Sequence, residues 1–294
     1  MKNIRLYPLK VLLAFAFVFC LLGTELLLSV KRIAQNPATF ETITETQQLD
    51  EKAYTTLESY FKSRANSTGI PAEVFLNPIT KEQLRQGTLD SVSDALAYLK
   101  HTSDSYEFRM DFTELETSIT EFFENYAEEN HFQKDEIYQQ KVTSTIAEAE
   151  KEILFIADTF KFSTIHESGW LEKARYYIPT LNQFIMFALG ITILIGVLLI
   201  LVCLKNIREA FYWLGVSGII SGILLTAPCG YLKATDYISG FVIKDPQIFA
   251  AVVGYLNTML NHELLQGVLT IAAGLLMLIL FAVLSAGNSE KKNN

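Results

Sequence analysis

The residues best suited to chemistry are four ionisable side chains that lie in or beside long apolar segments. Glu25 is the only charged residue in the apolar run 11–30. A carboxylate in hydrocarbon is costly, and an ionisable group there commonly serves a function. Asp236, His262 and Glu263 lie in the segment that precedes the last apolar run. If the fold brings these four side chains together, they form a candidate site for acid–base or ion chemistry.

Each candidate also has a purely structural interpretation. Glu25 lies within two turns of the end of its run, with Ser29 and Lys31 beyond it. We therefore favour a boundary carboxylate, partly hydrated or paired, over one that handles protons or cations. The four histidines lack zinc-binding spacing, because His262-Glu263 has no second histidine to complete an H-E-x-x-H motif, and solvated or helix-capping roles are expected for them. With no phosphate-binding glycine loop and no nucleophile elbow either, the sequence predicts no metal site and no cofactor.

Four apolar runs are long enough to cross a membrane. A helix rises about 1.5 Å per residue and the hydrocarbon layer is about 30 Å thick, so about 20 residues suffice. Such runs form helices because lipid cannot satisfy free backbone N–H and C=O groups. The predicted spans are residues 11–30, 184–204, 211–232 and 264–286. The remaining segments are a tail at 1–10, a large domain at 31–181, a short link at 205–210, a loop at 233–263 and a tail at 287–294.

The lysines and arginines predict the orientation of these spans. They precede the first span, occupy the link and follow the last span: Lys2, Arg5, Lys10, Lys205, Arg208, Lys291 and Lys292. With four crossings these groups share one side, which is expected to be cytoplasmic together with both termini. The domain 31–181 and the loop 233–263 are then extracytoplasmic. A cleaved signal peptide is the alternative for the first run, but no small-residue cleavage site follows it, so we expect an uncleaved anchor.

The domain 31–181 is acidic and is predicted to be helical throughout. It carries 26 acidic and 15 basic residues, whereas the whole chain has a net charge of -8. Apolar residues recur at steps of three and four, which is typical of amphipathic helices. Asn36-Pro37, Thr80 with Gln83, and Thr113 with Glu116 match helix-start patterns. We expect a bundle of four or five helices, with the carboxylates between Asp111 and Glu136 on a hydrated helix face.

Two further patterns concern packing near the membrane. Asp245-Pro246 begins an amphipathic stretch of about 16 residues, too short to span a membrane. We expect it to lie in the interface or against the bundle, with a segment that dips into the membrane as the alternative. Gly218, Gly222 and Thr226 place small residues on one face of the third span, which permits close helix contact. Packing within the chain is favoured over packing against a second copy.

Short phrases of the sequence carry a resemblance to other proteins. They are Asn36-Pro37-x-x-Phe40, Gly69-Ile70-Pro71-x-x-Val74-Phe75 and Ile79-Thr80-Lys81-Glu82. Together with the flanking spans they resemble uncharacterised bacterial multi-span membrane proteins. The resemblance implies an anchor, a helical extracytoplasmic domain and further spans. It implies no function and no site residue.

These observations predict an all-α protein of the bacterial cell membrane, with four transmembrane helices and an extracytoplasmic helical bundle inserted between the first and second spans. Cys20, Cys203 and Cys229 all lie in spans, and a cysteine-free outer domain is compatible with a bacterial envelope. The net negative charge argues against a nucleic-acid binder. The expected partners are membrane lipid and an unidentified protein, and a homo-oligomer stays open.

The expected role is non-enzymatic binding, sensing or scaffolding through the outer bundle. That bundle is joined to spans at both ends, so a partner that favours one helix arrangement would bias the spans. One alternative is an interfacial enzyme acting on a lipid or lipoprotein, with Glu25, Asp236, His262 and Glu263 as its site. Another alternative is an oligomeric channel or transporter subunit.

Overall fold

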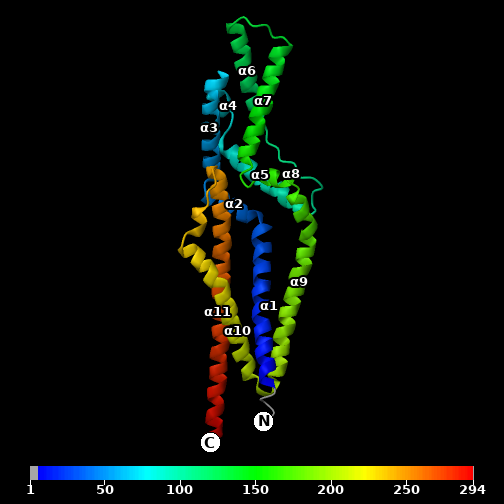
Figure 1. The fold of residues 1–294 in the computed structure, drawn as a ribbon, viewed down its shortest axis with the longest axis vertical. Helices are drawn as coiled ribbons and strands as arrows, with labels where there is room; N and C mark the ends of the chain where they lie inside the picture. Colours follow the sequence, from blue (N-terminus) through cyan, green and yellow to red (C-terminus); the bar gives the residue numbers. More distant parts are fainter. Residues whose placement is uncertain (1–5, 294) are drawn as a thin grey trace. The chain divides into compact units, whose positions relative to one another are not determined.

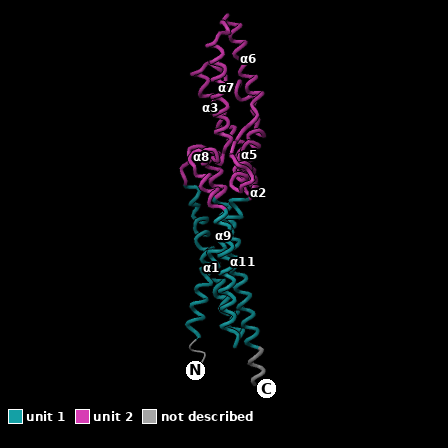
Figure 2. The backbone as a smooth tube through the Cα atoms, turned by 90° about the vertical axis from the view of Figure 1, so that its right-hand side faces the viewer, with its two compact units in different colours: residues 1–35, 179–240, 256–294 teal, residues 36–178, 241–255 magenta. Residues whose placement is uncertain are grey.

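The computed structural model describes residues 6–293, with side chains over residues 6–286, and that range contains no strand. Its helices group into two compact units (Figure 1, Figure 2). We call residues 1–35, 179–240 and 256–294 the four-helix unit, and residues 36–178 and 241–255 the acidic unit. The predicted all-helical class is thus confirmed for the described residues.

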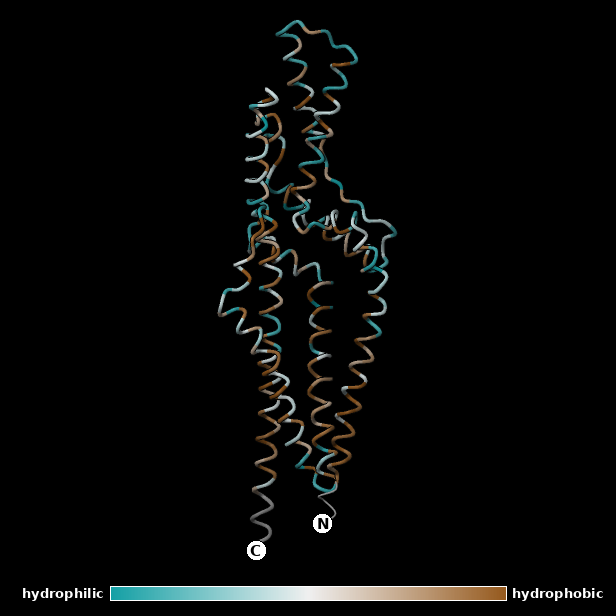
Figure 3. The backbone as a smooth tube through the Cα atoms, in the orientation of Figure 1, coloured by the Kyte–Doolittle hydropathy of each residue, from teal (hydrophilic) through white to brown (hydrophobic). Residues whose placement is uncertain are grey.

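Four helices are long and apolar enough to cross a membrane, as the sequence predicts. They are α1 (Tyr7–Ala34), α9 (Trp170–Val202), α10 (Arg208–Ala234) and α11 (Pro246–Asn293). Figure 3 shows hydrophobic residues along these helices. The predicted spans 11–30, 211–232 and 264–286 fall inside α1, α10 and α11. The predicted span 184–204 overruns α9, which ends at Val202 and is followed by a 3-10 turn, η2 (Leu204–Asn206).

Contacts inside the four-helix unit show that its helices alternate in direction. Lys10 of α1 forms an ion pair with Glu209 of α10, so these two helices begin at the same end. The hydroxyls of Thr24 in α1 and Thr192 in α9 lie 2.9 Å apart, and Arg208 donates to the carbonyl of Leu284 at 3.3 Å. The start of α1, the link and the last described side chains of α11 therefore share one end. The other basic residues used to predict orientation, Lys2, Arg5, Lys291 and Lys292, lie outside the described side chains.

The stretch after Asp245 differs from the expectation of a separate short helix. Pro246 begins α11, and α11 continues without interruption through the predicted fourth span. The physical reason is that no proline follows Pro246 in the rest of the chain, so nothing removes a backbone donor or blocks the helix. Its first residues pack in the acidic unit, where Ala250 and Ala251 are buried against Ile43 and Leu49. Packing against the bundle is thus what the structure shows for residues 246–255.

The acidic unit contains more and shorter helices than the four or five expected. Its complete helices are α2 (Pro37–Thr46), α3 (Leu49–Thr68), α4 (Ala72–Leu76), α5 (Lys81–Leu99), α6 (Thr113–Glu129), α7 (Glu136–Ala157) and α8 (Phe162–Glu167). Left-handed residues, which interrupt helices, occur at Gln48, Gly69 and Lys161. Gln48 separates α2 from α3, so a stretch with continuous helical composition becomes two helices.

Two of the three predicted helix starts are confirmed. The side chain of Asn36 accepts from the amide of Ala38 at 3.2 Å at the start of α2. Thr80 and Gln83 form the complete capping box of α5. The predicted capping box of Thr113 and Glu116 is wrong, because the Asp111 carboxylate accepts from both the amide and the hydroxyl of Thr113. The Glu116 amide, which the Thr113 hydroxyl was expected to cap, donates instead to the Phe112 carbonyl at 2.8 Å.

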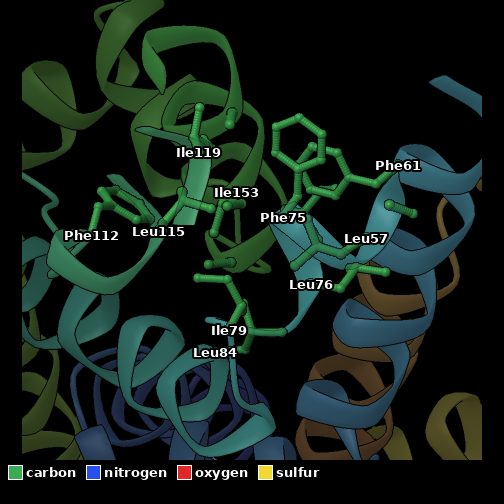
Figure 4. Packing of buried hydrophobic residues seen from close by; sticks show 14 of the residues in the cluster. Leu57, Phe61, Phe75, Leu76, Ile79, Leu84, Phe112, Leu115, Ile119 and Ile153 are labelled. Atoms are coloured by element: carbon green, nitrogen blue, oxygen red, sulfur yellow. The ribbon is translucent and has the colours of Figure 1, made fainter. Parts of the chain in front are cut away.

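The core of the acidic unit lies among α3, α4, α6 and α7 and the start of α5 (Figure 4). Its fully buried members include Leu57, Leu84, Leu115, Ile119 and Ile153. Each lies on the apolar face of a helix that turns its charged face outward. Burying such side chains stabilises the fold by roughly 1.5–3 kcal/mol each, so this seam holds the unit together.

A buried polar network joins α5 to the turn between α7 and α8. Asp158 is 1% exposed, and its carboxylate accepts from the Ser91 hydroxyl at 2.8 Å and the Phe162 and Ser163 amides at 3.0 and 2.7 Å. The Tyr106 hydroxyl lies 3.0 Å from Ser91 and 3.1 Å from Ser163. Every oxygen of the carboxylate therefore has a donor, which offsets the cost of its burial.

The Tyr106 phenol gives this network a pH dependence. Burial and the nearby Asp158 carboxylate raise the pKa of Tyr106 to about 12. Its proton is therefore held more tightly in the folded state, so the free energy of unfolding falls as the pH rises from 10 to 12. Between pH 9 and 11.5 we expect the Tyr106→Phe variant to lose about 2 kcal/mol less of this free energy than the wild type. Urea unfolding at both pH values measures this, and equal losses in the two proteins would contradict it.

Candidate functional site

A polar stripe on α1 meets a matching stripe on α11 within the four-helix unit. Glu25 and Ser29 are one turn apart on α1, and His262, Gln266 and Thr270 occupy successive turns of α11. Residues four apart share a helix face, so each stripe is continuous. Because the two helices run in opposite directions, Ser29 meets His262 and Gln266, whereas Glu25 meets Thr270.

Hydroxyl groups donate the hydrogen bonds that connect this cluster. The Thr270 hydroxyl donates to Glu25 Oε1 at 2.5 Å. The Ser29 hydroxyl lies 3.1 Å from Gln266 Oε1 and 3.2 Å from His262 Nδ1, and it also interacts with the Glu263 carboxylate. Since one hydroxyl carries one hydrogen, Ser29 cannot satisfy the Gln266 and Glu263 oxygens together. The hydroxyls of Ser29 and Thr270 therefore do not satisfy every carboxylate oxygen of the cluster.

Both carboxylates are buried and only partly satisfied. Glu25 is 7% exposed and Glu263 is 5% exposed. The Oε2 atom of each has no hydrogen-bond partner, and the two carboxylates interact electrostatically. Burying one charge without a partner is already costly, and a second like charge adds repulsion. A positively charged group near these oxygens would therefore stabilise the two carboxylates.

An open groove reaches one side of the cluster. Its volume is about 500 Å³, and its walls come from α1, α10 and α11. Glu25, Gln266 and Thr270 contribute its polar surface. The other lining side chains are apolar or small: Phe17, Leu21, Leu214, Gly218, Leu269, Ala273, Gly274 and Met277. A small ion or a proton carrier in this groove can approach Glu25.

The structure brings three of the four predicted site residues together. Glu25, His262 and Glu263 gather around Ser29, whereas Asp236 is exposed and accepts from the Ser239 hydroxyl at 2.7 Å. For Glu25 we expected a boundary carboxylate that is hydrated or paired; the structure shows a mostly buried carboxylate whose Oε1 accepts from the Thr270 hydroxyl. Sequence reasoning missed Gln266 and Thr270 as site residues. Their spacing of four from His262 was the available signal.

Two of the four histidines, His166 and His262, differ from the solvated or capping roles expected for them, whereas His101 and His131 are exposed. His262 contacts Ser29, as described above. His166 lies between the rings of Tyr98 and Tyr106, and its buried Nδ1 atom has no hydrogen-bond partner. His101 contacts the backbone and side chain of Arg175. Within the described residues, no group of three or more His, Cys, Asp or Glu side chains has the geometry to hold a metal ion.

The small residues of the third span pack against α11 of the same chain. A Cβ atom added to Gly222 would lie 2.6 Å from the Gly267 carbonyl, and one added to Gly274 would lie 2.7 Å from the Gly215 carbonyl. A Cβ atom on Gly218 would meet Gly274 at 3.4 Å, and Thr226 contacts Gly267. Backbone therefore meets backbone along this interface. This contact holds α11, with His262 and Glu263, in place beside α1.

The acidic unit has a separate cleft of about 450 Å³ between α3, α6 and α7. Its walls are aromatic and apolar, and they include Phe61, Phe75, Phe122, Phe123 and Tyr126. Phe61 and Phe75 stack with ring centroids 4.5 Å apart, which gives the cleft a rigid floor. Charged residues of both signs line it as well: Arg64, Lys141 and Glu148. An aromatic cavity with polar groups around it is a typical binding surface.

Comparisons with known proteins identified no relative of this chain. No protein-family model matches the chain, and neither a curated protein nor a solved structure matches it.

Proposed function

We propose that this is a multi-pass protein of the bacterial cell membrane that binds a protein partner through its acidic unit on the extracytoplasmic side. Four apolar helices that alternate in direction support a membrane location. Lys10 and Arg208 lie at one end of the four-helix unit, and positive charge of this kind favours the cytoplasmic side. The cysteine-free acidic unit supports an extracytoplasmic position in a bacterial envelope.

The observation that carries the binding role is the aromatic cleft between α3, α6 and α7. Aromatic side chains in a preformed cavity supply contact area at little cost in entropy. Half-exposed Tyr126 lies at this surface, and its ring stacks on Phe122. We expect the partner to insert an apolar or aromatic side chain there. The negative field of the unit favours partners with basic surfaces at long range.

Photo-crosslinking tests the cleft. With a photoreactive phenylalanine at position 126, we expect a specific adduct in native membranes, whereas the same group at the exposed Thr55 of α3 gives none. Ser144→Trp fills the cleft from its exposed rim without touching the core, and it should lower the adduct at least about tenfold, which corresponds to about 1.4 kcal/mol. Thr143→Trp, exposed on the same helix but outside the cleft, is the matched control. Equal adducts in both tryptophan variants would contradict the proposed site.

Cysteine labelling tests the orientation. In a background without Cys20, Cys203 and Cys229, we expect Ser144→Cys to react with a membrane-impermeant maleimide in intact cells. Lys205→Cys, which is exposed in the link, should react only after the cells are permeabilised. The opposite pattern would place the acidic unit in the cytoplasm and overturn this part of the proposal.

A specific observation supports each of the two alternative functions. An interfacial enzyme is supported by the approach of His262 to the Ser29 hydroxyl. However, Ser29 is fully buried and Asp236 lies apart, which leaves the hydroxyl without an open face for substrate. A channel or transporter subunit is supported by the two buried carboxylates, and it requires several copies to build a polar pathway. The cleft proposed for partner binding is more open than the surroundings of the Ser29 hydroxyl.

A further inference from the structure

We infer that the cluster around Glu25 and Glu263 is a binding site for one monovalent cation, either a proton or Na⁺. Two carboxylates from different helices interact electrostatically inside the four-helix unit, and each is more than nine-tenths buried. Each has an Oε2 atom without a hydrogen-bond partner. These two unpartnered oxygens indicate that the cluster is incomplete without a positive ligand.

The lysines and arginines in the described part of the chain supply no counter-charge to this site. Among the described side chains, no lysine or arginine forms an ion pair with either carboxylate. Lys10 pairs with Glu209 at the end of the unit, and Lys233 donates to Asn261. Removing two charges from water without compensation costs several kcal/mol per ion. A mobile cation is therefore the remaining source of neutralisation.

The groups that face the carboxylates come from every packed helix. His262 shares α11 with Glu263 and acts on it electrostatically, and the Cys229 thiol of α10 interacts with Glu263 as well. On the α9 side the contact to α1 is neutral, through Thr192 and Thr24. The histidine is the only one of these groups that can carry positive charge. Because its Nδ1 atom is at the Ser29 hydroxyl, it does not occupy the unpartnered oxygens.

The composition of the site favours a single small charge. Neighbouring like charges titrate together, so one bound cation reduces the repulsion between the two carboxylates. The neutral oxygens of Ser29, Gln266 and Thr270 add the hard ligands that Na⁺ also accepts. Glu25 also lines the groove between α1, α10 and α11.

Carbodiimide labelling of the full-length protein in native membranes tests this inference. A hydrophobic carbodiimide reacts with protonated carboxyl groups in apolar surroundings, and mass spectrometry locates the adduct. At pH 6 we expect at least tenfold more adduct on Glu25 or Glu263 than on Glu209, which is ion-paired in the same molecule and serves as the internal control. Labelling should fall as the pH rises towards 9. Labelling no greater than that of Glu209 at any pH, with no effect of Na⁺, would overturn the inference.

Two further experiments test which cation binds and whether the two carboxylates act as one site. Adding 100 mM Na⁺ in place of choline should lower labelling several-fold if the site takes Na⁺, and leave it unchanged if it takes only a proton. In Glu263→Gln the like charge next to Glu25 is removed, so the pH midpoint for labelling of Glu25 should move down. An unchanged midpoint would show that the two carboxylates do not act as one site. The wild-type arms decide the inference even if this variant fails to fold.

Discussion

Replacing Gly222 with alanine is expected to destabilise the four-helix unit by about 1–3 kcal/mol, the range for overpacking. The new Cβ atom would lie 2.6 Å from the Gly267 carbonyl and 3.0 Å from the Ile271 amide nitrogen. Both obstacles are backbone atoms, so no side-chain rotation relieves the clash. The helices α10 and α11 must move apart, and the van der Waals contact that holds them in lipid is then lost.

The matched controls for this prediction are Gly23→Ala in α1 and Gly190→Ala in α9. A Cβ atom at either position meets nothing within 4 Å. Since glycine in a helix interior costs roughly 0.5–1 kcal/mol relative to alanine, these variants should be neutral or slightly stabilised. The sign of the effect therefore separates a packing role from helix propensity.

The measurement is unfolding in mixed micelles with increasing sodium dodecyl sulfate. In a Trp170→Phe background Trp213 is the only tryptophan, and it lies in α10, where its ring meets Tyr7 of α1. Its fluorescence reports the unfolding of the four-helix unit. A Gly222→Ala variant as stable as the Gly190→Ala control would contradict backbone contact between α10 and α11.

Replacing Asp158 with alanine is expected to destabilise the acidic unit by about 3–5 kcal/mol. The change leaves the Ser91 hydroxyl and the amides of Phe162 and Ser163 without their acceptor. Each unsatisfied buried donor costs about 1–3 kcal/mol, and bonds to a charged acceptor are the stronger ones. The start of α8 should loosen first, because both amides belong to it.

Asp135 provides the control for this second prediction. Its exposed carboxylate caps α7 by accepting from the Tyr138 amide at 2.9 Å. Asp135→Ala removes one exposed cap and should cost only about 1 kcal/mol. Urea unfolding compares the two variants, and hydrogen exchange at Phe162 and Ser163 adds a local measurement. Equal costs for the two variants, or unchanged exchange at these amides, would show that the network does not hold α8.

Whether the polar cluster binds a cation and whether the acidic unit binds a partner are separate questions. The cleft lies wholly within the acidic unit, and the carboxylates lie wholly within the four-helix unit. Failure of the Tyr126 crosslink would remove the partner-binding proposal and leave the carbodiimide result standing. Failure of the carbodiimide experiment would likewise leave the cleft intact.

The amino-acid sequence by itself determined the four apolar helices, the helical class and two of the three helix starts. Each of these depends on neighbours within one run of the chain. A span needs about 20 apolar residues, and a cap needs an acceptor two or three positions before its amide. Asn36 and Thr80 satisfy this locally. Glu25, His262 and Glu263 were also recognisable as candidates, because an ionisable residue in or beside an apolar run is conspicuous.

Only the tertiary structure decided which side chains meet. Glu25 and Thr270 are 245 positions apart, and Ser29 and His262 are 233 positions apart. Neither the helix that faces α1 nor the rotation of that helix follows from composition. The close glycine contact between α10 and α11 sets both, since backbone can approach backbone at only one face of each helix. That contact places Gln266 and Thr270 beside Glu25 and leaves Asp236 at the surface.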